Sequence, residues 1–544
     1  MSQSFPFVSR IPGDNANSPS INGFDPSSAK SSTVVSATTT QVDEDAQTQS
    51  GPKPKNKVVV VGAGIAGLRA ASVLHRHGVE VVVLEARDRI GGRIWTVRSD
   101  ATGKPGVVRD MGAAWLHETA HNPLTRLIRE IGLTYYYDDG TPLYYTKFGR
   151  TSSQFKAKKV AEEFASFAEW YYRVNPNAKD KSVDAFIRKF VERHELISDD
   201  EKLWAPQAIR DVEHMLGTTT MESSAKHLCY FGWPERNLYV KGGYDGIVEW
   251  TSKSLKEDGA NVQLNRIVKH IDWSDDGSVS VGHKSVSGDD TAVISGDAVV
   301  VAVPLGCLHH NMLSFNPALP SDVQKGISKI SYGVLGKVFF EFSEVFWSKE
   351  NDQLIYIPSP SEYDDDDEAS SSSSEKLGPA DSILNYPTTT VNLSLIADNS
   401  KELCIQIVEP LAQRIEAMGN DHGRIYKFFV PLFKLLRTES SKALPALVNV
   451  AVTDWSCDPL AGFGTFATEK VGDEPEVLLE ALERHSGSHL QFAGDHCADV
   501  GCGCVHGAIS SGELAAKNLL KSFGIAYDGG DLATIRCDID SDDE

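Results

Sequence analysis

A glycine-rich turn near the start of the chain constrains its fold more than any other feature. The turn, Gly62–Gly67, has the pattern G-x-G-x-x-G and follows a short, wholly apolar run, Val58–Val61. Residues 65–77 then repeat apolar side chains at helical spacing, and Glu80–Leu84 reads as a second buried strand. A strand, a tight turn, a helix and a second buried strand predict an α/β fold with a parallel sheet.

The spacing of the three glycines is typical of a site for a dinucleotide. Gly62 permits the tight turn, Gly64 lets the backbone approach a pyrophosphate, and Gly67 lets the helix pack closely on the strand. The phosphates would then lie at the helix N-terminus, whose amides attract anions. The second strand ends at Glu85, where a carboxylate accepts ribose hydroxyls and disfavours a phosphorylated ribose.

The run Glu85–Arg93 indicates which dinucleotide to expect. Its glycine pair, Gly91 and Gly92, permits a second close approach of backbone to the pyrophosphate, and Arg87 and Arg93 can offset the phosphate charge through forked hydrogen bonds. The alternative for both arginines is a surface salt bridge. This extended fingerprint resembles that of the flavin-containing amine oxidase superfamily, in which the cofactor is FAD, buried along its length.

The resemblance covers about residues 57–522 and is strongest for the polyamine oxidase branch. Asp110–His117 resembles the segment of polyamine oxidases that runs under the flavin ring, and Ser331–Val338 resembles the strand whose lysine faces flavin N5 through a water. Trp455–Pro459 and Phe492–Asp495 match closing motifs of the family. The chain lacks the covalent-attachment cysteine motif of monoamine oxidases, so the resemblance implies non-covalent FAD.

The resemblance also assigns roles to individual residues. Lys337 would be the water-bridging lysine at flavin N5, and His117 would contact the polyamine; the alternatives are a lysine at a strand edge and a packing histidine. Trp115 could equally be a core residue, whereas Trp455 is expected to pack beside FAD, with a core position as the alternative. The residues expected at the cofactor are Gly62, Gly64, Ala66, Gly67, Glu85, Ala86, Arg87, Gly92, Arg93, Gly112, Ala113, Ala114, Trp115, Val268, Trp455, Gly494, Asp495, Cys504 and Val505.

Two segments depart from the family pattern. The aromatic placement in Gly462–Phe466 is unusual, and Gly501–Cys504 replaces the bulkier residues that usually line the flavin face. The site could therefore be wider, take a different amine, or be inactive. Histidines and cysteines between 496 and 506 suggest a metal, but their C-x4-C-x-C spacing matches no zinc-finger pattern, so we expect no metal there. A redox-sensing pair, Cys502 and Cys504, is a further alternative.

The expected organisation is two interleaved domains, a Rossmann-like FAD-binding domain and a substrate domain of mixed sheet plus helices. The FAD-binding domain would comprise residues 56–115, 237–310 and 455–525, and the substrate domain residues 116–236 and 311–454. Segments 1–55, 361–379 and 526–544 are polar or acidic and are expected to be disordered.

The charge of the chain and its targeting signals limit which partners and which cellular location we expect. The formal net charge of −22 argues against nucleic acid, although two acidic stretches, 362–368 and 526–544, carry more than half of it. Eight cysteines in 544 residues do not form a disulfide scaffold. No secretory, membrane-spanning or peroxisomal signal is visible, so we expect a cytoplasmic protein, with the nucleus possible. The oligomeric state stays open.

The sequence therefore predicts FAD-dependent oxidation of spermine, spermidine or their acetylated forms, with oxygen as acceptor and hydrogen peroxide as product. Three alternatives stay open. An L-amino-acid or other amine oxidase would need an arginine for the carboxylate, and none lies in 110–123. A histone-lysine demethylase would need a long helical arm, which 155–235 does not offer, and a chromatin-binding module, which 1–55 does not offer. A non-catalytic flavoprotein is suggested by Gly501–Cys504.

Overall fold

The computed structural model describes residues 56–529, apart from 100–104, 121, 139, 152–154, 229–236, 275–276, 289, 361–380 and 398–399, and also residue 532. Contacts divide the chain into Met1–Lys53 and Pro54–Glu544, and every element below belongs to the second unit. The segments expected to be disordered, 1–55, 361–379 and most of 526–544, lie outside the described residues.

A five-stranded parallel sheet carries the glycine turn. Its order is β10-β2-β1-β14-β23, and its strands are β1 (Lys57–Val61), β2 (Glu80–Leu84), β10 (Asn261–Gln263), β14 (Ala298–Val301) and β23 (Leu490–Phe492). The three central strands β2, β1 and β14 are almost wholly apolar because both faces of the sheet are covered. The parallel sheet confirms the α/β prediction.

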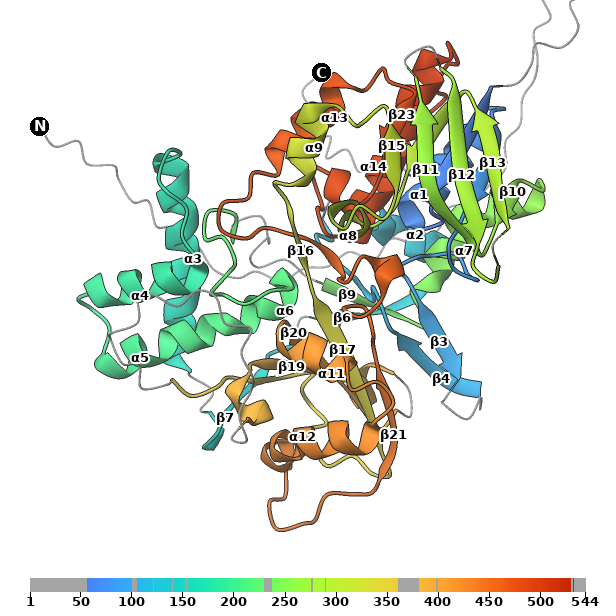
Figure 1. The fold of residues 1–544 in the computed structure, drawn as a ribbon. Helices are drawn as coiled ribbons and strands as arrows, with labels where there is room; N and C mark the ends of the chain where they lie inside the picture. Colours follow the sequence, from blue (N-terminus) through green and yellow to red (C-terminus); the bar gives the residue numbers. More distant parts are fainter. Residues whose placement is uncertain are drawn as a thin grey trace, which may run out of the picture. The chain divides into compact units, whose positions relative to one another are not determined.

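Helices pack on one face of this sheet and a second sheet lies over the other. On the first face α1 (Ile65–Arg76) packs against α7 (Asp245–Glu257) and α14 (Val505–Ser522), with α2 (Leu124–Glu130) in the same apolar core. On the other face lies the sheet β13-β12-β11-β15, drawn in green and yellow-green in Figure 1. Its strands and neighbouring helices are β11 (Arg266–Trp273), β12 (Val279–Ser285), β13 (Thr291–Gly296), β15 (Ser314–Asn316), α8 (Leu305–His309), α9 (Ser321–Ile327) and α13 (Glu476–Arg484).

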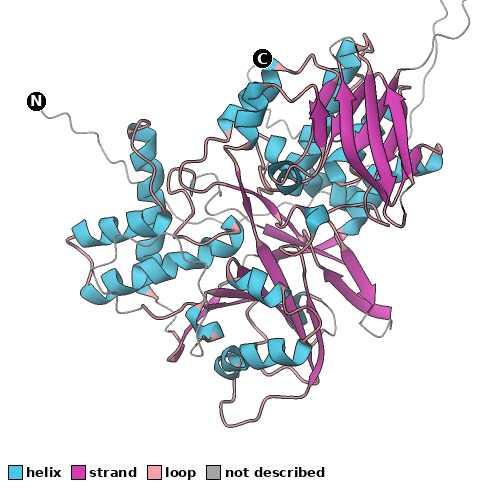
Figure 2. Ribbon diagram, in the orientation of Figure 1, coloured by secondary structure: helices cyan, strands magenta, loops and turns pink. Residues whose placement is uncertain are grey.

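A seven-stranded sheet forms the other main layer, with the order β21-β17-β20-β19-β18-β7-β8. Its strands are β7 (Leu143–Thr146), β8 (Gly149–Arg150), β17 (Leu335–Phe342), β18 (Gln353–Tyr356), β19 (Thr388–Asn392), β20 (Glu402–Val408) and β21 (Leu447–Val452). Aromatic residues of α12 (His422–Leu436), with α11 (Leu411–Glu416) and the short helix η3 (Ile383–Asn385), fill the core on one face. Figure 2 shows these helices beside the sheet.

Helices α3 (Lys156–Val174), α4 (Val183–Arg193) and α5 (Asp199–Ala208) form a helical lobe with its own aromatic core. Ile355 and Ile357, at the end of β18, belong to the same core and so tie the lobe to the seven-stranded sheet. The turns η1 (Ile209–Val212) and α6 (Glu213–Leu216) lead from the lobe back toward β20.

Short strands connect the two main sheets. They are β5 (Trp115–Leu116), β6 (Thr134–Asp138) and β9 (Asn237–Lys241) in one sheet, β3 (Thr96–Ser99) with β4 (Pro105–Asp110), and β16 (Ser331–Gly333) with β22 (Phe466–Thr468). The parallel sheet takes strands from each of the three segments expected in the FAD-binding domain. By contrast β15 and α9, expected in the substrate domain, pack beside β11 and α13. The exact division into two domains stays a prediction.

The strand-like residues 391–396 predict a strand, and this local prediction is wrong beyond Asn392. Strand β19 ends at Asn392, and α10 (Leu393–Ile396) follows. The Asn392 side chain accepts hydrogen bonds from Trp347 and Ser394 and donates two to backbone carbonyls, so it fixes the point where the chain turns. Hydrogen bonds of the tertiary structure therefore override the strand-like local pattern.

Candidate active site

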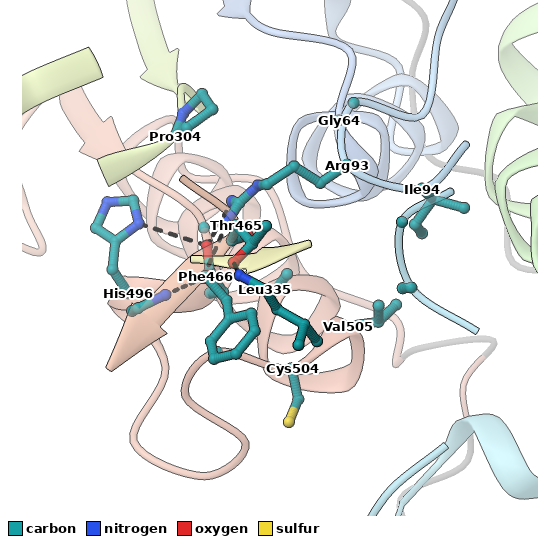
Figure 3. A pocket seen from close by; sticks show the side chains of 18 of the residues that line it. Gly64, Arg93, Ile94, Pro304, Leu335, Thr465, Phe466, His496, Cys504 and Val505 are labelled. Carbon is teal, nitrogen blue, oxygen red and sulfur yellow. Dashed lines mark hydrogen bonds and ion pairs between the residues drawn. The ribbon is translucent and has the colours of Figure 1, made fainter. Parts of the chain in front are cut away.

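A cavity of about 1320 Å³ is lined by residues from both main sheets. The carboxyl ends of β1 and β2 contribute to it, as ligand sites in open parallel sheets do. Much of the remaining wall comes from residues 111–118, β17 and the stretch 494–505. Figure 3 shows Arg93 reaching toward Thr465, with Phe466 and Cys504 nearby.

The glycine turn presents backbone amides to this cavity. Gly62 has φ +103°, and a Cβ added to Gly67 would lie 2.0 Å from the Gly62 carbonyl oxygen, so α1 packs directly on the turn. Gly64 precedes α1 without a side-chain cap, and the first turn of α1 has no acidic residue. A Cβ added to Gly64 would meet no atom of the chain within 4 Å. The N-terminus of α1 and the open space beside Gly64 together fit a phosphate group.

Glu85 closes the turn from the end of β2. Its Oε2 accepts from the Ala63 amide at 2.7 Å and its Oε1 from the Arg87 amide at 2.8 Å. Burial raises the pKa of Glu85, while these two amide hydrogen bonds favour the carboxylate. Glu85 lines the cavity, where its remaining lone pairs can accept hydroxyl groups.

The second glycine pair packs on the first turn, since the Gly91 amide donates to the Ala63 carbonyl at 2.8 Å. The two arginines expected to offset phosphate charge line the cavity, but each already has a carboxylate partner. Arg87 pairs with Asp458 at 2.6 Å. Arg93 forms two hydrogen bonds to Asp495, at 2.6 and 3.1 Å, and donates to the Thr465 carbonyl at 2.7 Å.

Lys337 lies buried on the opposite wall. Its Nζ donates to the carbonyl oxygens of Asp110 at 3.0 Å and Gly112 at 2.5 Å, and lies 5.3 Å from the centre of the Trp115 ring. Burial lowers the pKa of Lys337. Trp455, also buried, donates from its indole to the Met111 carbonyl at 2.8 Å. The two side chains therefore hold the backbone of 110–112 at the edge of the cavity.

Two partly buried histidines line the cavity beyond Trp115. His117 Nδ1 lies 2.8 Å from Asn237 Oδ1, and burial lowers the pKa of His117. His214 Nδ1 lies 2.6 Å from the Asp211 carbonyl oxygen, and burial lowers the pKa of His214 to about 4. Both imidazoles are therefore neutral near pH 7. We call the part of the cavity lined by His117, Tyr144, Lys158, Glu162, Asp211 and His214 the distal arm.

The cavity brings together both residues predicted to be catalytic and nearly all those predicted to contact the cofactor. Gly67 is the exception: it faces Gly62 and Ala302 and serves helix packing. Those in the wall are Lys337, His117, Gly62, Gly64, Ala66, Glu85, Ala86, Arg87, Gly92, Arg93, Gly112, Ala113, Ala114, Trp115, Val268, Trp455, Gly494, Asp495, Cys504 and Val505. Their roles toward cofactor and substrate stay predictions.

Sequence reasoning missed most of the distal arm. In this arm Lys158 pairs with Asp211 at 2.5 Å. Asp138, elsewhere in the cavity wall, was missed as well; it accepts from the Trp115 indole at 3.1 Å and from Gln353 at 2.7 Å. No usable signal was present in the sequence, because Lys158 and Asp211 lie in stretches that carry several other charged residues. Such residues need a partner when they are buried, but the sequence does not say which.

The two segments that depart from the family pattern meet in the cavity wall. Phe466, Cys502 and Cys504 all line it. Burial raises the pKa of Cys504 to about 12, so this thiol is protonated and a weak nucleophile. Within the described part of the chain, no three His, Cys, Asp or Glu side chains are placed to hold a metal ion.

Comparison with known proteins identifies the family. The model of the flavin containing amine oxidoreductase family matches residues 65–520, and a pyridine nucleotide-disulphide oxidoreductase model matches residues 11–101. A glycine turn, a buried acidic residue at the end of β2 and a large cavity between two sheets define a dinucleotide-binding oxidoreductase. The chain belongs to the flavin containing amine oxidoreductase family, and its cofactor is FAD.

Individual relatives agree with this family. The chain is 29% identical to polyamine oxidase 3 of Oryza sativa subsp. japonica, with 84% of this chain and 88% of that protein covered. It is 27% identical to a corticosteroid-binding protein of Candida albicans, covering 86% and 96%. A lysine-specific histone demethylase 1 homolog of Arabidopsis thaliana is 26% identical, covering 86% and 30%.

A solved structure of putrescine oxidase bound to putrescine has a TM-score of 0.63, with 19% identity, and covers 86% of this chain and all of that chain. This likeness supports the fold. The resemblance to flavin-containing amine oxidases, predicted from the sequence motifs, is thus confirmed.

In the described part of the chain, no helix is both long and apolar enough to cross a membrane.

The cavity wall fits FAD. The space beside Gly64, the uncapped N-terminus of α1 and the buried Glu85 carboxylate suit the phosphates and a ribose of a dinucleotide. The wall also contains Val268, whose backbone the resemblance places beside the adenine, and the segment 112–115 expected under the flavin ring. No cysteine lies among Gly462–Phe466.

Proposed function

We propose that this member of the family oxidises polyamines such as spermine, spermidine or their acetylated forms, with non-covalently held FAD. The overall reaction converts a secondary amine, oxygen and water into an aldehyde, a shorter amine and hydrogen peroxide. The observation that carries the proposal is the buried Lys337, held against the Asp110 and Gly112 carbonyls at one wall, in the same cavity as an arm lined with carboxylates.

When bound, FAD supplies the acceptor for the hydride that leaves the carbon beside the amine nitrogen. The chain's part is to present that amine unprotonated, because a protonated nitrogen has no lone pair to assist the loss of hydride. Burial lowers the pKa of an amine. His117 and His214 add no positive charge here, since burial keeps both neutral.

Lys337 and its neighbours fix the geometry of the reacting region. Its ammonium holds the backbone of 110–112 through two carbonyl oxygens and faces the Trp115 ring. Because burial lowers its pKa, Lys337 releases a proton more readily than an exposed lysine does. It can therefore position a water molecule and exchange a proton with it during reaction with oxygen.

An anaerobic absorbance titration tests the proposal. The purified yellow protein is mixed with spermine, spermidine, N-acetylspermine and L-leucine, and bleaching of the flavin band is followed. Bleaching by a polyamine alone supports the proposal. Bleaching by L-leucine alone favours an amino-acid oxidase, and no bleaching by any of the four overturns the polyamine assignment.

A second candidate is a flavoprotein that binds an apolar ligand without oxidising it. The small residues Gly501–Cys504 in the cavity wall favour it, as does the similarity to a protein named for corticosteroid binding. This candidate predicts a shift of the flavin spectrum with a steroid and no bleaching with any amine. For either candidate we propose a cytoplasmic or nuclear location.

A further inference from the structure

The helical lobe (Figure 1) carries a groove of about 420 Å³, lined by α3, α4 and the residues that flank α4. Four aromatic side chains form its apolar wall, Phe167, Tyr171, Phe186 and Phe190. The ring centre of Phe167 lies 5.1 Å from that of Phe190 and 5.8 Å from that of Phe186, so the rings form a continuous surface. Phe167, Tyr171 and Phe190 are only partly buried. The groove therefore offers an aromatic surface on which another ring can stack.

The rest of the groove wall is basic, and we call the whole the basic groove. Lys181, Lys189 and Arg193 line it, and among the described residues no carboxylate does. The Lys181 ammonium lies 5.6 Å from the centre of an aromatic ring of the wall. Whereas Arg188 on the same helix pairs with Asp184 at 2.8 Å, no described carboxylate pairs with any of the three cations of the groove. The described part of the chain therefore leaves a concentration of positive charge here without a partner.

We propose that the basic groove binds the acidic run Glu362–Glu368 of the same chain. The run reads Glu-Tyr-Asp-Asp-Asp-Asp-Glu and lies outside the described residues. It brings six carboxylates and no basic residue to a groove in which the described residues supply three cations and no carboxylate. Such complementarity favours the matching partner and disfavours partners of the wrong charge. Tyr363 can stack on the aromatic wall while the neighbouring carboxylates pair with the cations.

The place of the run in the chain also favours this assignment. Strand β18 ends at Tyr356, Ile357 packs in the same apolar core as the four aromatic rings, and the run begins five residues later. From Ile357 to Glu368 an extended chain spans up to about 37 Å, whereas α3, with 19 residues, is about 28 Å long. The run is therefore long enough to reach across the lobe. The other acidic stretch, 526–544, follows α14, which packs on α1 and β23.

The covalent link makes a weak contact sufficient. A segment tethered this closely meets its groove at an effective concentration of about 1 mM. Exposed ion pairs are individually weak, so we expect the free run to bind with a Kd of only about 0.1 mM. In the full chain the groove would then be occupied about nine-tenths of the time. A free copy of the run should therefore bind the wild type about tenfold more weakly than a chain whose own run cannot bind.

A fluorescent peptide of residues 361–370 tests the proposal by its anisotropy on the full-length, FAD-containing protein. The amide variant keeps the length of the run and replaces its acids by their amides: Glu362→Gln, Asp364→Asn, Asp365→Asn, Asp366→Asn, Asp367→Asn and Glu368→Gln. We expect the peptide to bind this variant about tenfold more tightly than the wild type, because the run of the wild type occupies the groove.

A charge reversal locates the binding site. Lys189→Glu with Arg193→Glu, made in the amide variant, should abolish peptide binding, because two of the three cations of the groove change sign. The matched control reverses two exposed lysines outside the groove, Lys159→Glu with Lys253→Glu, and should change the peptide Kd less than about twofold. FAD content and the circular dichroism spectrum verify that each variant is folded.

Three results would overturn the proposal: no peptide binding to the amide variant, equal binding to the amide variant and the wild type, or binding that survives Lys189→Glu with Arg193→Glu. Equal binding that is lost in this double variant would assign the groove to an acidic segment of another protein. A difference that disappears when the wild type is diluted would assign it to the run of a second copy, which also overturns docking within one chain. None of these measurements uses enzyme turnover, so their outcome is independent of the proposed polyamine oxidation.

Discussion

Replacing Gly64 by alanine should separate cofactor binding from folding. The backbone at Gly64 has φ −68° and ψ 171°, an extended conformation that alanine adopts without strain. An added Cβ meets no atom of the chain within 4 Å. The free energy of unfolding of the apoprotein should therefore stay unchanged or rise by up to about 1 kcal/mol, because alanine restricts the unfolded chain.

The same methyl group occupies the space in which we place the pyrophosphate. We expect Gly64→Ala to be purified with little or no FAD and to take up added FAD poorly. The flavin-to-protein absorbance ratio and urea unfolding of the apoprotein measure the two effects separately. A Gly64→Ala protein with full flavin content would refute the assignment of the phosphates to this turn.

Gly67→Ala is the matched control at the next glycine of the motif. There the added Cβ would lie 2.0 Å from the Gly62 carbonyl oxygen and 3.1 Å from the Ala302 Cβ. Since the first contact is with backbone, α1 must move away from β1, at a cost of about 1–3 kcal/mol or more. This variant should lose stability and FAD together, whereas Gly64→Ala loses FAD alone.

Three further predictions follow from the ion pairs and buried groups of the site. Lys337→Met should still be bleached by substrate, but its flavin should reoxidise in air at least about tenfold more slowly, as stopped-flow absorbance can measure. Asp495→Asn leaves the partly buried Arg93 without its bidentate carboxylate and should cost about 3–5 kcal/mol in urea unfolding. His214, whose pKa falls from 6.5 to about 4 on folding, binds its proton more readily in the unfolded chain between these values. Stability should therefore fall by about 3 kcal/mol from pH 6.5 to 4 through this residue, and His214→Gln should lose that part of the pH dependence of unfolding.

The parts of the site built from backbone could be predicted from the sequence. Gly62 has the positive φ that favours glycine, Gly64 leaves open the space in which we place the phosphates, and Glu85 follows at the end of β2. These positions are close in the chain, so their spacing in the sequence predicts how they lie in the structure. The family resemblance then added distant residues such as Lys337, which no local pattern singles out.

The distal arm could not be predicted because its residues meet only in the tertiary structure. Tyr144 comes from β7, Lys158 and Glu162 from α3, and Asp211 from η1. Each of these charged or polar residues could equally lie at a surface when judged by its neighbours in sequence. The carboxylate partners of Arg87 and Arg93 were missed for the same reason, since Asp458 and Asp495 lie 371 and 402 residues away.

Those two distant ion pairs imply that cofactor binding and closure of the fold are coupled. Arg87–Asp458 and Arg93–Asp495 join the segment after β2 to the last third of the chain, and Arg87, Arg93 and Asp495 line the cavity. A ligand that binds only the folded chain stabilises it by mass action. In our assignment FAD contacts both of the chain segments that these ion pairs join. Loss of FAD should therefore weaken the contact between the same two segments. Flavin content and the stability of the apoprotein should therefore fall together when either pair is broken, in contrast to Gly64→Ala, whose apoprotein keeps both pairs.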